Sequence, residues 1–228
     1  MTAVWIACAA VVLALAGGLA TRRRVRSRRV LPRSERAEIV ALTDSTSIDR
    51  ATGAVCSVQR ADLTIGRREL AEIWTPMHLE RLARTYWRFL SRVTLGLVRV
   101  HYTAERRSVV LLARPLRLLT FKAPEYEMDG SRGLVRWRIE RGLLVARRGR
   151  NGAGFLHIEV TRRPGEDPLH ELLHVEVAVV NFYPAIASGL SLRLYNATQS
   201  RIHVIITSSF LRSLARLDLA ESRVGRFG

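Results

Sequence analysis

The periodicity of the chain changes within residues 75–103, which read TPMHLERLARTYWRFLSRVTLGLVRVHYT. Thr75 followed by Pro76 is typical of a helix N-cap and first helical position. Apolar residues then recur at the three- and four-residue spacing of an amphipathic helix, as far as Gly96. From Val98 onward apolar and polar residues alternate, which is the period of a strand with one buried face. This stretch therefore predicts a helix followed directly by the first strand of a sheet.

Short apolar segments separated by turn signals continue beyond this point. The turns are marked by Asp129-Gly130, Arg141-Gly142 and the run PGEDP at residues 164–168. Short strands joined by short connections favour an antiparallel meander. We expect its further strands at 107–113, 116–121, 134–140, 143–148, 155–162 and 171–180.

The segments on either side of this core are less regular. Upstream we expect a short helix at 36–42 and a loop at 43–47. A short strand at 54–58 and a second short helix at 69–74 should follow. Downstream, the apolar spacing favours a helix from about 199 to 219. A strand at 202–207 is the alternative there, because that stretch is rich in β-branched residues.

The predicted fold class is α+β, with an antiparallel sheet flanked by helices in one domain at residues 67–222 and a short tail at 223–228. The order of helix, strands and C-terminal helix is loosely similar to the layout of helix-grip domains, which curl a sheet around a helix and hold apolar ligands. That resemblance implies a lipid or other apolar ligand. It also implies an apolar cavity of about 300 Å³ or more under the C-terminal helix.

Residues 2–20, TAVWIACAAVVLALAGGLA, contain no charge and no proline. At ~1.5 Å per residue they would span roughly 28 Å, close to the ~30 Å hydrocarbon core of a bilayer. A secretory signal peptide is the alternative, but Met1 and Thr2 provide no positive n-region. We therefore expect an uncleaved, single-pass transmembrane helix before the domain.

A basic connector is expected at residues 21–66. By the positive-inside rule its arginines place the N-terminus outside and the C-terminal domain in the cytoplasm of a bacterial cell. The same arginines would meet anionic lipid headgroups at the membrane surface. They are Arg22, Arg23, Arg24, Arg26, Arg28 and Arg29.

The formal net charge of +17 raises the question of nucleic acid binding. Of the 37 basic residues, however, only Lys122 is lysine, and such an excess of arginine is typical of a GC-rich genome. No helix-turn-helix, zinc-finger or RNA-binding motif accompanies the charge. Cys8 and Cys56 form no CxxC pair and cannot make a disulfide framework. We expect a protein or the membrane surface as partner, rather than specific nucleic acid.

Two His-x-Glu motifs are the candidate metal ligands. His157 and Glu159 share one face of a predicted strand, and His174 and Glu176 share one face of the next. If these strands pair, two imidazoles and two carboxylates would come together, a donor set that suits a divalent metal. The alternative is a solvent-exposed sheet face with cross-strand ion pairs.

Other candidate sites are weaker. Phe182, Tyr183 and Tyr195 lie where the chain changes direction and could line a pocket or simply pack at a corner. We identify no nucleophile with a neighbouring base and no GxSxG elbow, and we expect no cofactor. The first functional expectation is therefore a membrane-anchored binding domain. The alternatives are a helix-grip-type domain with an apolar ligand and a metal-dependent enzyme.

Overall fold

The computed structural model describes residues 38–111, 116–185 and 210. Strands dominate these residues, with two helices between the second and third strands. The elements are β1 (Glu38–Ile48), β2 (Val55–Gly66), α2 (Arg67–Ile73), α3 (Pro76–Val93), β3 (Val98–Tyr102), β4 (Arg106–Leu111), β5 (Arg117–Lys122), β6 (Glu125–Met128), β7 (Arg132–Arg141), a 3₁₀ turn (Arg147–Gly149), β8 (Phe155–Pro164) and β9 (His170–Phe182).

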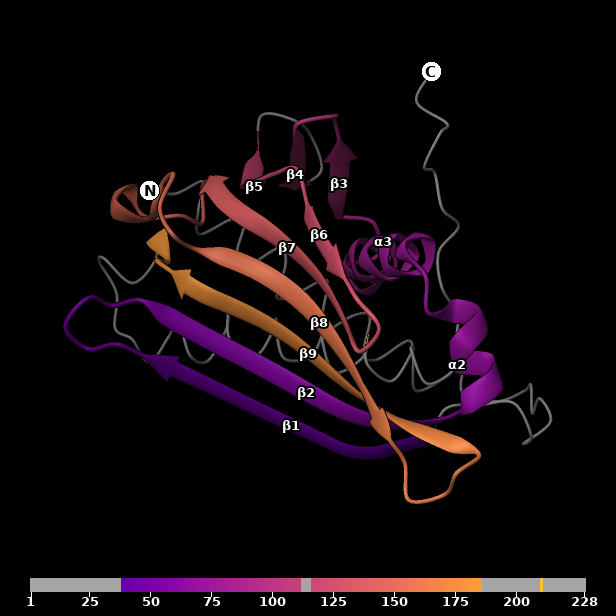
Figure 1. Ribbon diagram of the computed structural model, residues 1–228. Coiled ribbons are helices and arrows are strands. Elements are labelled where there is room, and N and C mark those ends of the chain that lie inside the picture. The colour runs from indigo at the N-terminus through magenta and orange to yellow at the C-terminus, as the bar shows by residue number, and fades with distance from the viewer. Residues whose placement is uncertain (1–37, 112–115, 186–209, 211–228) are drawn as a thin grey trace.

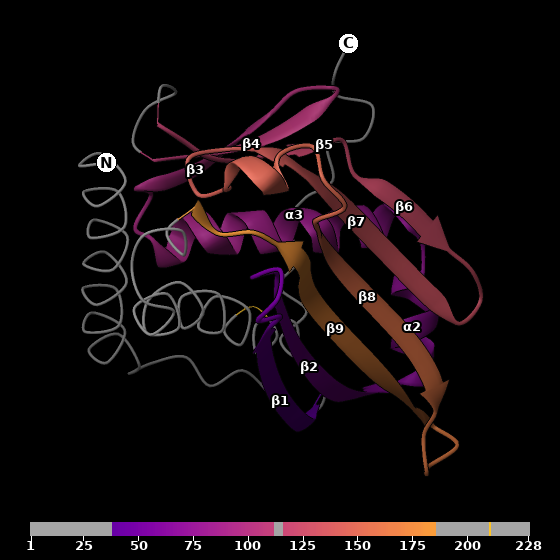
Figure 2. The same ribbon diagram turned by 90° about the vertical axis from the view of Figure 1, so that its left-hand side faces the viewer.

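The strands form one antiparallel sheet in the order β1-β2-β9-β8-β7-β5-β4-β3, and β6 pairs separately with β7. Figures 1 and 2 show the sheet curving around α3, with β1 and β2 on one side of the helix and β3, β4 and β5 on the other. α2 lies beyond the start of α3, over the end of β2. The long helix therefore covers the concave face of the sheet.

The predicted helix after Thr75 is confirmed as α3. The Thr75 hydroxyl accepts a hydrogen bond from the His78 backbone N–H (3.3 Å), and Pro76 occupies the first helical position. The helix ends where Leu95 and Gly96 both adopt positive φ, at 53° and 79°.

Aromatic side chains form the centre of the core between α3 and the sheet. The Trp87 ring lies 5.2 Å from that of Trp137 and 5.4 Å from that of Phe121. Tyr86 packs edge-on against Phe210 at 5.4 Å, and Phe210 is helical and buried. The rest of the C-terminal helix predicted from about 199 to 219, and its strand alternative, lie outside the described residues.

The predicted fold class, an α+β domain behind a transmembrane helix, is wrong. The described residues are mostly antiparallel sheet, and α2 and α3 follow β1 and β2 instead of preceding the sheet. Among the described residues no helix is both long and apolar enough to cross a membrane, and the single-pass membrane classification is corrected accordingly. Residues 2–20 and the arginine collar themselves lie outside the described residues.

The sheet begins at Glu38, within the stretch expected to be a connector. The expected short helix at 36–42 and loop at 43–47 are wrong, because β1 occupies residues 38–48. β1 is an edge strand with mostly exposed side chains, so its sequence carries little alternation. The strand predicted at 54–58 is shorter than β2, because the buried row of β2 includes the polar Ser57 and Gln59.

Five of the other predicted strands are confirmed within a few residues as β4, β5, β7, β8 and β9. The strand predicted at 143–148 is wrong. Gly142, with φ of 152°, ends β7, and Leu143 and Leu144 then donate backbone hydrogen bonds to the start of β5. β6, at 125–128, was missed because it is only four residues long and largely exposed.

Candidate functional site

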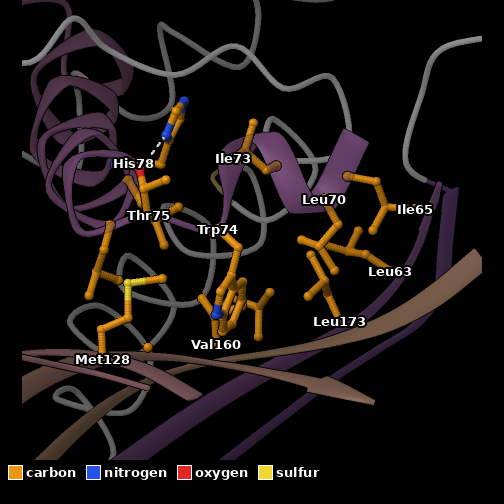
Figure 3. Close-up of a pocket in the computed structure, with 14 residues that line it drawn as sticks. Leu63, Ile65, Leu70, Ile73, Trp74, Thr75, His78, Met128, Val160 and Leu173 are labelled. Atoms are coloured by element: carbon orange, nitrogen blue, oxygen red, sulfur yellow. Dashed lines mark hydrogen bonds between the residues drawn. The ribbon is translucent and has the colours of Figure 1, made fainter. Parts of the chain in front are cut away.

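An apolar cavity of about 90 Å³ lies between the sheet, α2 and the first turns of α3 (Figure 3). Its inner wall consists of buried residues, and its rim consists of half-buried ones. The wall residues are Leu63, Ile65, Leu70, Leu79, Leu82, Gly133, Val160, Leu173 and Val175. The rim residues are Ile73, Trp74, Thr75, His78 and Met128.

The alternation of each strand supplies the wall on the sheet side. Leu63 and Ile65 occupy consecutive inward positions on β2, and Leu173 and Val175 do the same on β9. On α3, Leu79 and Leu82 lie on one face of the helix and point to the core. Short apolar side chains thus meet from three directions.

A glycine leaves the space in the middle of this wall. Met128, Gly133, Val160 and Val175 lie opposite one another in register across β6, β7, β8 and β9. Gly133 has no side chain in this row, and a Cβ built there would stand 3.4 Å from a methyl group of Leu79. The missing side chain therefore leaves room for about one methyl group between β7 and Leu79 of α3.

Two polar side chains, Thr75 and His78, reach the rim, and they are hydrogen-bonded to one another. Thr75 Oγ1 lies 2.8 Å from His78 Nδ1. Burial, and secondarily the charge of Arg81, lower the pKa of His78 below its ordinary value, which favours the neutral imidazole. In Figure 3 the imidazole points away from Met128 and Val160. The side chains that face the cavity are thus essentially apolar.

The indole of Trp74 closes one side of the cavity. Its Nε1–H donates to the backbone carbonyl of Asp129 (2.9 Å), in the turn between β6 and β7. The guanidinium of Arg162 stacks over the ring, with its carbon 5.4 Å from the ring centre. The one polar atom of this indole is therefore also paired, and the side chains around the cavity suit a hydrocarbon group.

The cavity differs from the one that the helix-grip layout implies. That layout predicts about 300 Å³ or more under the C-terminal helix, whereas the observed space is smaller and lies under the start of α3. The C-terminal segment that would cover the predicted site lies, apart from Phe210, outside the described residues.

The His-x-Glu residues lie on the outer face of the sheet, away from the cavity. Glu159 and Glu176 stand opposite one another on β8 and β9. His157 Nε2 contacts Glu176 Oε1 at 3.1 Å, and Glu176 also pairs with Arg60 at 2.7 Å. Arg132 donates to Glu159 at 2.8 Å and holds the pKa of that carboxyl below its usual value. Each of these three candidate ligands already has a hydrogen-bonding or ionic partner.

The fourth candidate, His174, is drawn toward a different strand. Its Nδ1 lies 2.6 Å from Oδ1 of Asp62 on β2. Within the described part of the chain, no group of three or more His, Cys, Asp or Glu side chains is placed to hold a metal ion. The arrangement is a row of cross-strand ion pairs.

Two of the three predicted aromatic candidates lie in the described part of the chain. Phe182 is buried in the core at the end of β9, and Tyr183 stacks with Arg148 at 5.1 Å. Tyr195 lies outside the described residues, as do the predicted membrane-surface arginines. Sequence reasoning missed the cavity. The available signal was Gly133 beside a predicted strand, since a glycine in a strand often marks a close approach or a missing side chain.

No protein-family model matches the chain, and no curated protein matches it. Among solved structures, the chain is similar to the solution structure of CalU16 from Micromonospora echinospora, with a TM-score of 0.31 and 12% identity over 85% of this chain and 82% of that one. It is also similar to an uncharacterised protein from Rhizobium leguminosarum, with a TM-score of 0.23 and 13% identity over 69% of this chain and 98% of that one. At these scores the similarities support no conclusion about function.

Proposed function

We propose that this domain binds a small hydrocarbon molecule, or the hydrocarbon end of a larger one, in the cavity between α3 and the sheet. The observation that carries the proposal is the apolar wall around the gap at Gly133. Genuinely empty cavities in proteins are apolar, and such cavities take up benzene or xenon.

The size of the cavity sets the size of the ligand. Pockets for drug-sized molecules usually measure about 300–1,000 Å³, whereas this one measures about 90 Å³. At ~24 cal/mol per Å³ of cavity, filling it restores contacts worth roughly 2 kcal/mol. That free energy corresponds to a dissociation constant of roughly tens of millimolar, so we expect small ligands to bind weakly.

The chemistry of the wall sets the class of the ligand. Thr75 and His78 bond to each other, and the Trp74 N–H bonds to Asp129. A polar ligand atom placed in the cavity would lose its hydrogen bonds to water without replacement, at a cost of about 1–3 kcal/mol. Benzene is therefore expected to bind more tightly than phenol, by roughly fivefold or more.

The test is a titration of the full chain with benzene, followed by the NMR signals of isoleucine, leucine and valine methyl groups. The shifts should grow with benzene concentration and concentrate on methyls that line the cavity, such as those of Leu79 and Val160, and should spare the exposed Val40 and Leu169. No shift at the cavity methyls, or shifts spread evenly over the molecule, would contradict the proposal.

A matched pair of variants sharpens this experiment. Val160→Ile adds one methylene at the cavity, and Val40→Ile makes the same change on the exposed face of β1. We expect the first to weaken benzene binding several-fold and the second to leave it unchanged. Equal affinities in both variants would place the benzene elsewhere.

A further inference from the structure

The connection between the two helices is a single tight turn at the rim of the cavity. The Thr75 backbone N–H donates to the Ile73 carbonyl (2.9 Å), and Trp74 between them has φ of −82° and ψ of 69°. These values define an inverse γ-turn. α2 therefore joins α3 through a one-residue pivot, and that residue carries the indole that closes the cavity.

α2 itself is held by few contacts. It is seven residues long, and Leu70 is its one buried residue. Figure 3 shows Leu70 pointing toward Leu63 and Leu173. At the other end of α2, the Arg67 backbone N–H donates to Leu169 O (2.9 Å). A helix this short is not stable without its tertiary contacts, and segments with little buried apolar surface open locally at low cost.

Two contacts, with Arg162 and with the Asp129 carbonyl, hold the indole in place, and together we call them the latch. Arg162 follows Val160 on the inner face of β8, and it stacks on Trp74 at 5.4 Å. Two hydrogen bonds, of 2.7 and 2.8 Å, fix Arg162 to Glu171 on β9. The hydrogen bond from Trp74 to Asp129 O forms the second half of the latch. The two contacts of the indole itself, with Arg162 and with the Asp129 carbonyl, are made while it lies over the cavity.

We propose that Trp74 is the entrance residue of the cavity, and that α2 with Trp74 moves as a lid about the turn at residues 73–75. The inference rests on the proposed function, because it names the route by which that ligand enters. The sheet and α3 form the other walls, and both are continuous elements.

The first test needs no ligand. Amide hydrogen exchange of the full chain should show the amides of residues 71–73 exchanging by local opening, faster than those in the middle of α3. Trp74→Phe keeps an aromatic ring but removes the N–H that bonds to Asp129. It should raise α2 exchange roughly two- to tenfold and leave α3 unchanged. Glu72→Gln, on the exposed side of α2, is the control and should change nothing.

The second test is kinetic. If the lid closes over both the empty and the filled cavity, weakening the latch speeds both benzene association and benzene dissociation. NMR line shapes of the Val160 methyls report both rates. Trp74→Phe with unchanged rates, or α2 amides that exchange only together with α3, would overturn the lid.

The two tests separate this inference from the proposed function. If α2 opens locally but the protein binds no benzene, the proposed function is contradicted, and the cavity has no ligand for a lid to admit. Benzene binding in a protein whose α2 exchanges only with the core, by contrast, supports the cavity as a site and contradicts the lid.

Discussion

Replacement of Gly133 by alanine should stabilise the protein, although Gly133 is buried near the start of β7. A Cβ at this position would stand 3.4 and 3.7 Å from the two methyl groups of Leu79, which is van der Waals contact rather than overlap. Gly133 is also not among the residues with positive φ, so alanine fits the backbone in the described structure. The added methyl would occupy space that is now empty.

The expected gain has two parts. Burying one methyl group is worth about 0.8 kcal/mol. Replacing glycine by alanine at a compatible position restricts the unfolded chain and adds about 0.4–1 kcal/mol. Because the shorter contact to Leu79 is at the tight end of the ordinary range, we take the lower part of the sum and expect Gly133→Ala to raise the free energy of unfolding by about 1 kcal/mol.

Urea denaturation of the full chain measures this change, read as a shift of the midpoint at an unchanged slope. Gly130→Ala is the matched control, because a Cβ there meets no atom within 4 Å and gains only the unfolded-state part. Gly133→Ala should be the more stable of the two and should bind benzene more weakly than the parent. Destabilisation by more than about 1 kcal/mol, or a gain no larger than that of the control, would refute the reasoning that the wall has a gap at Gly133.

Three further changes test other parts of the structure. Gly142→Ala should lower the free energy of unfolding by about 2 kcal/mol or more in urea denaturation, because φ is 152° and a Cβ would overlap the Leu118 carbonyl oxygen. His78 should titrate below 6.5 in an NMR pH titration. Between its lowered pKa and 6.5 the unfolded state binds more protons than the folded state, so the free energy of unfolding rises with pH across this window. His78→Gln should flatten that rise. The hydrogen bonds from Arg162 hold the pKa of Glu171 below 4.5. The ionised carboxylate therefore stabilises the folded protein above pH 4.5, and this stabilisation is lost as the pH falls through the lowered pKa. Glu171→Gln should remove that loss from acid denaturation curves.

Local signals in the sequence were sufficient for α3 and most of the sheet. The Thr75-Pro76 cap and the apolar spacing act within one or two turns, so they predict a helix without knowledge of its neighbours. β2 escaped recognition along most of its length because its inward row contains Ser57, Gln59 and Ala61 between the larger apolar residues. A small or polar inward residue is compatible with a strand only because the surrounding fold buries it.

The cavity could not be predicted, since it depends on which residues meet across strands. Met128, Gly133 and Val160 are brought into one row by the register of β6, β7 and β8. The interaction partners of the His-x-Glu residues could not be predicted for the same reason. Their shared face follows from the period of a strand, but their partners, Arg60, Asp62 and Arg132 among them, follow from the strand order.

A crystal of the full chain under xenon pressure tests the central claim most directly, because xenon enters dry apolar cavities without needing any hydrogen bond. We predict a xenon atom between Leu79, Val160 and Leu173, with the surrounding side chains in place. An intact domain with no xenon at this position, or with ordered water there instead, would contradict the account of this cavity as a hydrocarbon site.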